Sequence, residues 1–423
     1  MDARVRQIVA AAGQAAAEGR MADADRIFRQ AETEAPHHPI VLNEQAGRLM
    51  GMGRPAEAWD RLQAATKAHP AEPYLWVSTA TAARALGRAA EEKTALEKAL
   101  ALDPRNLRAL MHMGALHEDR GEVRAAAAVY RTALQSVPRG ANLPPEMRQH
   151  MQHAQQLVDT NNRALEDFLD QRLDGVRARH GGQPLRRFDS CLATLLQKQP
   201  IYRQRPTFLY FPELPAIEFF DRDQFPWLDA IEAATSDIRD EFVKVFAEDQ
   251  DNMVPYVQGM ATSEVWRELN ESRRWSVYYL WRGGEAVPEN QARCPRTMAA
   301  LEAWPKCELL GSSPSAVFSI LDAKTLIPPH TGVNNARLIC HLPLIVPESC
   351  WFRVGAQKRE WNEGHAFVFD DTIEHEAWNG SDSPRAVLIF DIWNPLVDPA
   401  ERELVATLTA GVADFYGSLP SYL

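Results

Sequence analysis

At 423 residues the chain is too long for one compact core, so two or three domains are expected. Hydrophobic residues make up 45% and charged residues 24% of the chain, which indicates a soluble globular protein. The formal net charge of -11 argues against a nucleic acid or an anionic membrane surface as the main partner.

The five cysteines predict a reducing compartment. They are scattered and show no CxxC spacing, so neither a disulfide framework nor a zinc knuckle is indicated. The first twenty residues carry charges where a signal peptide would need an apolar core, and no run of about 18 apolar residues occurs. A cytoplasmic protein without a membrane span is therefore expected.

The first third of the chain repeats with a period of 34 residues. The repeating glycines are Gly19, Gly53, Gly87 and Gly121, and the prolines are Pro36, Pro70, Pro104 and Pro138. Seven residues before each glycine lie Ala12, Ala46, Ala80 and Gly114, and nine after it lie Phe28, Leu62, Leu96 and Tyr130. This pattern predicts a helix–turn–helix unit in which small residues let two helices approach and glycine forms the turn.

The repeat resembles the tetratricopeptide repeat, and residues 1–140 hold four units in phase. An alanine-rich helical bundle could share the composition but would not keep the period over four units. Glu92 departs from the small residue expected at its position and should weaken the third unit locally. Arrays of this kind stack into a superhelix whose concave groove usually holds a peptide or protein segment.

After Pro138 the period is lost. Residues 141–198 begin with a Pro/Gly-rich break and continue as a long amphipathic pattern. Capping or linking helices are expected there.

Residues 199–423 are richer in aromatic residues and prolines, and short strands dominate their second half. A helix is expected over 226–246, an aromatic strand ending in a Gly-Gly turn over 273–284, and a short helix over 294–304. Further strands are expected over 315–321, 336–346, 350–355, 365–371 and 385–393. Regularly spaced strands of this kind predict a jelly roll or another antiparallel barrel-like fold.

Two histidines in this part of the chain could hold a metal. His330 is expected where a strand enters a turn, and His375 soon after another strand. Two imidazoles with open coordination positions suit Fe(II), but Gly332 occupies the place where a carboxylate ligand is common. From the spacing alone, histidines in the core or in a turn remain an alternative.

The segment from about Trp275 to Pro395 resembles the aspartyl/asparaginyl beta-hydroxylase family. The motifs are "SILDAKTLIPPHTGVNNARLICHLPL", "WNEGHAFVFDDTIEHEAWN" and "RAVLIFDIWNP". These oxygenases use Fe(II), 2-oxoglutarate and dioxygen on a double-stranded β-helix, and they bind iron through two histidines with glycine in place of the carboxylate. Gly332 thereby agrees with the family pattern.

The resemblance implies a role for each matching residue. His330 and His375 would bind iron, and Ser319 and Arg385 would hold the distal carboxylate of 2-oxoglutarate, a task suited to a hydroxyl and a guanidinium fork. The remaining matches are His341 on the cosubstrate side, Arg337 lining the site and Asp371 near the iron, where it could orient a bound water.

Several of these residues have structural alternatives. Arg385 could be a surface strand residue, His341 a hydrogen-bonded core histidine, and Asp371 a turn cap. Arg353 could face the site or solvent, and Trp275 and Trp281 are expected in the core. The family's protein-modifying members carry a second arginine where this chain has Ile339, and this difference concerns the substrate.

The expected fold is a tetratricopeptide-repeat superhelix followed by a double-stranded β-helix (jelly-roll) domain with flanking helices over 199–423. The expected activity is hydroxylation of an unactivated C–H, with the β-carbon of Asp or Asn in a peptide recruited by the repeats as the target. The alternatives are a small-molecule or lipid hydroxylase and a non-catalytic interaction protein. The oligomeric state is left open.

Overall fold

The computed structural model describes residues 2–138, 140–141, 143–180, 185–260, 262–309 and 311–417. The chain divides into two compact units, residues 1–184 and 185–423. The division falls inside the segment 141–198, where linking helices were expected.

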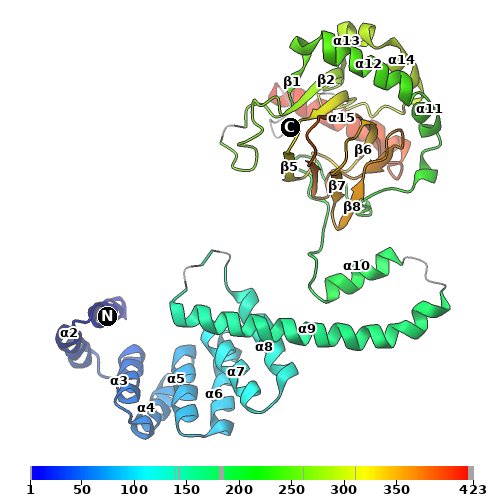
Figure 1. Cartoon of the computed structure of the whole chain (residues 1–423). Coiled ribbons are helices and arrows are strands. Elements are labelled where there is room, and N and C mark those ends of the chain that lie inside the picture. The colour runs from blue at the N-terminus through cyan, green and yellow to red at the C-terminus, as the bar shows by residue number, and fades with distance from the viewer. Residues whose placement is uncertain are drawn as a thin grey trace. The chain divides into compact units, whose positions relative to one another are not determined.

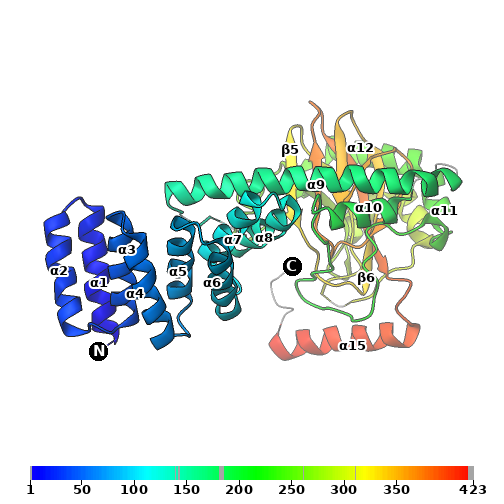
Figure 2. The ribbon, with the colours of Figure 1, turned by 90° about the horizontal axis from the view of Figure 1, so that it is seen from below.

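The N-terminal unit contains four successive helix pairs (Figure 2). The pairs are α1 (Asp2–Ala17) with α2 (Met21–Glu34), α3 (Pro39–Gly51) with α4 (Pro55–Ala68), α5 (Pro73–Ala85) with α6 (Ala89–Leu102), and α7 (Leu107–Asp119) with α8 (Val123–Ser136). The four glycines of the repeat lie between the helices of each pair, at φ angles of 76°, 73°, 69° and 70°. Glycine adopts this left-handed conformation without steric cost, which explains its recurrence. The predicted repeat architecture is confirmed.

Helix contacts within each pair depend on the small and large positions of the repeat. Phe28, Leu62, Leu96 and Tyr130 are all buried. In the fourth pair the large position is Tyr130, and the small position that it packs against is Gly114 rather than the alanine found in the other three pairs. A Cβ atom on Gly114 would lie 2.1 Å from Cε1 of Tyr130, so the glycine makes room for the ring.

Gly114→Ala should therefore destabilise the fourth repeat by about 1–3 kcal/mol, because the added methyl overpacks the Tyr130 contact. Urea unfolding followed by circular dichroism would measure this loss. The double variant Gly114→Ala with Tyr130→Leu should recover much of it, since Ala80 and Leu96 already form this combination. Gly47→Ala, where no atom lies within 4 Å of the new Cβ, should be neutral or slightly stabilising. Equal losses at both glycines would contradict the packing argument.

The departure at Glu92 is accommodated by an ion pair. Its side chain is buried and lies 3.1 Å from Nη1 of Arg84. Arg84 also pairs with Asp119 at 2.5 Å, so one guanidinium joins the third and fourth helix pairs. The long amphipathic segment forms a single helix, α9 (Pro145–Arg179), which contacts α8 and buries Ala154 and Val158.

The C-terminal unit contains two antiparallel sheets. The larger has the order β1-β2-β4-β11-β6-β9, with β3 paired to β2, and the smaller has the order β5-β10-β7-β8. The strands are β1 (Val254–Pro255), β2 (Trp275–Arg282), β3 (Glu285–Ala286), β4 (Ala316–Leu321), β5 (Thr325–His330), β6 (Arg337–Ile345), β7 (Cys350–Val354), β8 (Gln357–Glu360), β9 (Phe367–Phe369), β10 (His375–Asn379) and β11 (Arg385–Trp393). These sheets confirm the predicted β-rich fold.

The two faces of the larger sheet have different partners, because successive strand residues point to opposite sides. Phe318, Leu342 and Phe390 pack with Ile231 and Ile238 in one apolar cluster. The opposite face shares a second cluster with the smaller sheet. The flanking helices are α10 (Arg186–Leu195), α11 (Leu228–Ala233), α12 (Thr235–Glu248), α13 (Pro288–Arg293), α14 (Pro295–Ala300) and α15 (Pro399–Tyr416). Figure 1 shows α11 to α14 together on one side of this unit, away from β7 and β8.

Two helical features differ from the sequence prediction. The helix expected over 226–246 is two helices, α11 and α12, separated at Ala234. Helix α15 was not predicted, although Asp398 and Glu401 form a capping box at its start.

Candidate functional site

Strand pairing brings the two histidines together between the sheets. His330 ends β5 and His375 begins β10, and the two residues are direct partners in the antiparallel register. Their ring centroids are 4.0 Å apart. Hydrogen bonding between β5 and β10 thus brings together two histidines that are separated by 44 residues in the sequence.

Hydrogen bonds fix the same tautomer in both rings. Nδ1 of His330 donates to the carbonyl of Pro328 at 2.8 Å, and Nδ1 of His375 donates to that of Ile373 at 3.1 Å. Burial, together with His375, holds the pKa of His330 well below its usual value, and burial lowers the pKa of His375 to about 4. At neutral pH both Nε2 atoms therefore carry free lone pairs, the form in which imidazole binds metals.

Gly332 is required by the position of Asp371. A Cβ atom at residue 332 would lie 2.0 Å from Oδ2 of Asp371, and the Gly332 amide donates to the Asp371 carbonyl at 2.7 Å. The carboxylate from the β9–β10 turn thus fills the space that a side chain at 332 would need. This contact gives a steric reason for glycine two residues after His330.

Ser319 and Arg385 lie on neighbouring strands of the larger sheet. Ser319 of β4 is opposite Val387 and Arg385 of β11 is opposite Leu321, so the two side chains are diagonal neighbours on one face. Nε1 of Trp275 donates to Oγ of Ser319 at 3.1 Å. The Ser319 hydroxyl proton remains available for an acceptor.

Arg385 is a buried cation that has no counter-ion among the described residues. The residue is 2% exposed, and no carboxylate of the described residues lies within ion-pair distance of it. Burial lowers the pKa of Arg385 to about 10. Its guanidinium carbon lies 4.9 Å from the ring centre of Trp361, which also stacks on His341 at 5.5 Å. Among the described residues, Nδ1 of His341 and Nε1 of Trp361 are buried without hydrogen-bond partners.

Arg337 is held by two carboxylates. Its Nη1 donates to Oδ2 of Asp391 at 3.0 Å, and its Nη2 donates to Oδ2 of Asp371 at 3.3 Å. Burial works against the charge, but both carboxylates outweigh it and raise the pKa of Arg337. The residue expected to line the site therefore anchors Asp371 beside Gly332.

Asp391 should give folding a pH dependence between about pH 4 and 6. Burial raises the pKa of Asp391 to about 6 despite the opposing effects of Arg337 and Ser313. In this window the folded state holds a proton that the unfolded chain has lost, so this contribution to the free energy of unfolding falls as pH rises. In the wild type this free energy of unfolding should fall by on the order of 2–3 kcal/mol across the window, and the fall should be absent in Asp391→Asn. Urea unfolding at several pH values measures it, and parallel wild-type and variant profiles would contradict the assignment.

Sequence reasoning missed Trp361, Trp266 and Asp391. The ring centre of Trp266 lies 5.0 Å from that of His330. The available signal for Asp391 was a lone acid inside an apolar strand, and Trp361 is the first residue of one of the family motifs. Nothing in the sequence distinguished Trp266. Trp275, expected in the core, is buried and also contacts Ser319, while Trp281 packs on Trp304 away from the site.

The remaining candidate, Arg353, faces acidic neighbours rather than the histidines. It pairs with Glu374 at 3.0 Å and with Glu376, and its Nη1 donates to the Tyr202 hydroxyl at 3.2 Å. Its position beside β10 supports the backbone around His375.

The histidine pair offers two protein ligands. Within the part of the chain that the structure describes, no group of three or more His, Cys, Asp or Glu side chains could hold a metal ion. The neutral, preoriented imidazoles fit a metal such as Fe(II) that keeps open positions for other ligands. The buried, unpaired Arg385 fits a carboxylate guest.

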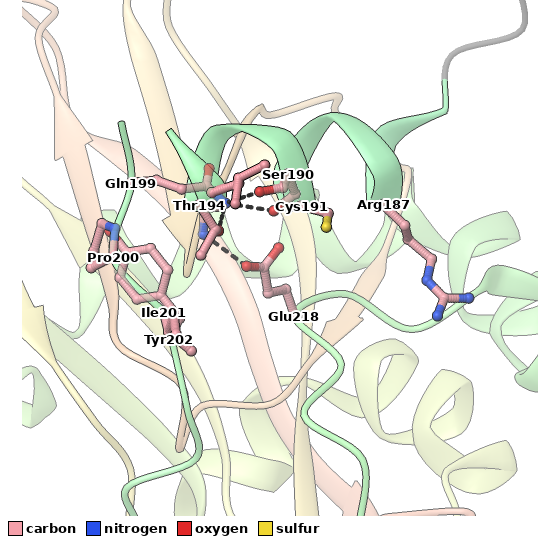
Figure 3. A pocket seen from close by; sticks show the side chains of 11 residues that line it. Arg187, Ser190, Cys191, Thr194, Gln199, Pro200, Ile201, Tyr202 and Glu218 are labelled. Atoms are coloured by element: carbon pink, nitrogen blue, oxygen red, sulfur yellow. Dashed lines mark hydrogen bonds between the residues drawn. The ribbon is translucent and has the colours of Figure 1, made fainter. Parts of the chain in front are cut away.

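A separate pocket of about 530 Å³ lies beside α10 (Figure 3). It is lined by Arg187, Ser190, Cys191, Thr194, Leu195, Gln199, Pro200, Ile201, Tyr202, Glu218 and Ala356. Gln199 donates to Ser190 and Thr194, and Glu218 accepts from the Ala356 amide and from Gln357. None of the candidate site residues lines this pocket. The candidate metal ligands and the buried Arg385 lie elsewhere in the β domain.

The C-terminal unit thus holds a two-histidine site between antiparallel sheets, and comparisons with known proteins point to a hydroxylase family. Residues 232–395 match the family model described as aspartyl/asparaginyl beta-hydroxylase. The match lies within the C-terminal unit and confirms that this part of the chain resembles that family, as its motifs indicated.

Individual relatives match about half of the chain or less. The human aspartate beta-hydroxylase domain-containing protein 2 is 32% identical over 204 residues, which cover 47% of this chain and 53% of that protein. The ornithine lipid ester-linked acyl 2-hydroxylase of Rhizobium tropici is 36% identical over 184 residues, covering 43% of this chain and 62% of that protein. The chain thus spans about half the length of the curated relatives it matches.

The repeat unit is similar to solved structures. A thermophilic TPR protein of Thermus thermophilus has a TM-score of 0.32 and 20% identity, covering 46% of this chain and 97% of that one. Within the described residues, no helix is both long enough and apolar enough to cross a membrane.

Proposed function

We propose that this chain is an Fe(II)- and 2-oxoglutarate-dependent dioxygenase that hydroxylates an unactivated C–H of a peptide or protein. The observation that carries the proposal is the buried, unpaired Arg385 in the same β domain as two neutral imidazoles. A buried cation is costly unless an anion pairs with it, so this site is built for a carboxylate guest.

Each residue of the site has a task in this proposal. His330 and His375 would hold the iron through their Nε2 atoms, and Arg385 with Ser319 would bind the distal carboxylate of 2-oxoglutarate. His341 and Trp361 would enclose that cosubstrate, while Asp371, fixed by Arg337, could accept a proton from a water near the metal. With both groups bound, dioxygen would convert C–H to C–OH while 2-oxoglutarate is oxidised to succinate and CO2.

The experiment is a succinate assay with the purified full chain, Fe(II), ascorbate and 2-oxoglutarate. We expect iron-dependent succinate formation, accelerated by cell-lysate peptides that gain one oxygen atom. Absence of both iron binding and succinate would exclude the proposed function and favour a non-catalytic interaction protein.

The repeats are proposed to recruit the substrate, because stacked helix pairs present an extended groove. Residues 1–184 form a compact unit with apolar cores of their own. Added in excess as a separate fragment, they should compete for a recruited peptide and slow its hydroxylation. Unchanged turnover would instead favour a small molecule or lipid, as named for the Rhizobium relative.

We also place the chain in the cytoplasm. All five cysteines are free, and four of them are buried. A reducing compartment keeps thiols in this state.

A further inference from the structure

The strand β6 presents three residues to the candidate site. Arg337, Ile339 and His341 alternate along the strand and therefore share one face, while Leu338 and Cys340 point into the helix-covered core. Ile339 is opposite Asp391 of β11 and Phe369 of β9. Its side chain packs with the apolar cluster between the sheets. An apolar residue thus separates the carboxylate-bound arginine from the cosubstrate side.

The positive charge of Arg337 is already paired with acidic side chains. One guanidinium faces two carboxylates, Asp371 and Asp391, at 3.3 Å and 3.0 Å. The side chains of the two acids are 8% and 0% exposed, so bulk water screens this group little. Both Nη atoms of Arg337 pair with these acids, and its Nε is the part of the guanidinium left without a hydrogen-bond partner among the described residues. A substrate carboxylate placed here would lie beside two other carboxyl groups rather than beside a free cation.

The surroundings of His330 are aromatic. Trp266 and Trp275 lie with ring centres 5.0 Å and 6.3 Å from that of His330. Tyr256 stacks on Trp275 at 4.1 Å and is 46% exposed, so this aromatic group continues to the surface. Aromatic rings contribute apolar contact area and attract cations, and neither property favours an anion.

We infer that the substrate group presented to the histidine pair carries no carboxylate, so that an uncharged or cationic side chain is hydroxylated and an acidic one is rejected. This inference rests on the proposed function. It narrows the expected Asp or Asn target to exclude Asp. Arg385 remains the cation for a carboxylate, and that carboxylate belongs to the cosubstrate.

The test uses the full chain with Fe(II), 2-oxoglutarate and ¹⁸O₂ on a cell-lysate peptide mixture and, separately, on a lipid extract. Mass spectrometry then identifies every residue or chain that gains the labelled oxygen. Normalised to the number of each residue present, uncharged or cationic residues should be labelled at least about tenfold more often than Asp or Glu, corresponding to about 1.4 kcal/mol of discrimination. Labelled acyl chains would satisfy the charge inference while contradicting a peptide substrate. Preferential labelling of Asp or Glu would overturn it.

Failure of the charge inference can be separated from failure of the proposed function. No succinate under any condition would remove the proposed function itself. Succinate without any labelled product would count against the inference, because both mixtures are rich in uncharged aliphatic groups.

Two variants of Ile339 test whether the lack of a free cation on this face causes the preference against acidic residues. Ile339→Arg adds a cation on the site face, so it should shift labelling towards acidic residues by about tenfold or more, while Ile339→Leu should keep the wild-type preference. Circular dichroism would confirm that both variants fold. An Ile339→Arg protein that folds but keeps the wild-type preference would show that charge at this position does not select the substrate.

Discussion

Alanine at His330 or at His375 should each reduce iron-dependent succinate formation at least about 100-fold. The two imidazoles are the only metal ligands that the described part of the site offers, since no third His, Cys, Asp or Glu joins them. With one removed, a divalent ion would be held by a single side chain. Isothermal titration with Fe(II) or Co(II) under anaerobic conditions should show the loss of binding directly, without reference to turnover.

His365→Ala is the matched control for these variants. His365 is exposed and lies in the same β domain, on the loop before β9, so its removal should leave metal binding and succinate formation unchanged. Full activity in His330→Ala or His375→Ala would contradict the assigned ligands. Equal losses in all three variants would indicate a general effect of histidine substitution on folding.

The repeat array could be predicted from local information alone. A period of 34 residues specifies where each helix ends, and contacts occur between neighbouring units, so sequence position determines spatial position. Aligning the units also shows that the fourth has a smaller residue, Gly114, and a larger one, Tyr130, at two positions that contact each other. The ion pair that accommodates Glu92 was less accessible, because Arg84 lies outside the repeating positions.

The candidate site depended on information that spacing does not contain. Whether His330 and His375 meet is decided by the pairing of β5 with β10, and antiparallel register is set by side-chain packing over the whole sheet. Strand positions were predictable from alternation and turn residues, but their order in two sheets was not. The resemblance to the family motifs led to the prediction that the two histidines lie together. Their spacing alone left histidines in the core or in a turn as an alternative.

The missed residues show the same limit. Trp361 lies on a turn between β8 and β9, and only the fold brings its ring over Arg385 and His341. Arg337 was expected to line the site, and its two acidic partners come from the turn before β10 and from β11. A sequence shows that an arginine is present but not whether its charge is free.

Replacing Arg385 with methionine should weaken 2-oxoglutarate binding and stabilise the free protein at the same time. The fall of the Arg385 pKa from its usual value to about 10 corresponds to about 3 kcal/mol paid by the folded state for the buried charge. Loss of the contact with Trp361 returns only about 0.5–2 kcal/mol, so a net stabilisation on the order of 1–3 kcal/mol is expected without cosubstrate. Urea unfolding of the free protein measures it.

The same substitution should raise the dissociation constant for 2-oxoglutarate by about 100-fold or more, because a buried carboxylate would lose its charged partner, a loss of about 3–5 kcal/mol. Arg353→Met is the contrasting variant. Arg353 already pairs with Glu374 and Glu376, so its removal should destabilise the free protein by leaving two acids unpaired. Opposite signs of the stability change at these two arginines would distinguish a cation reserved for a ligand from one that supports the fold. A destabilised Arg385→Met protein with unchanged cosubstrate affinity would assign Arg385 to the fold instead.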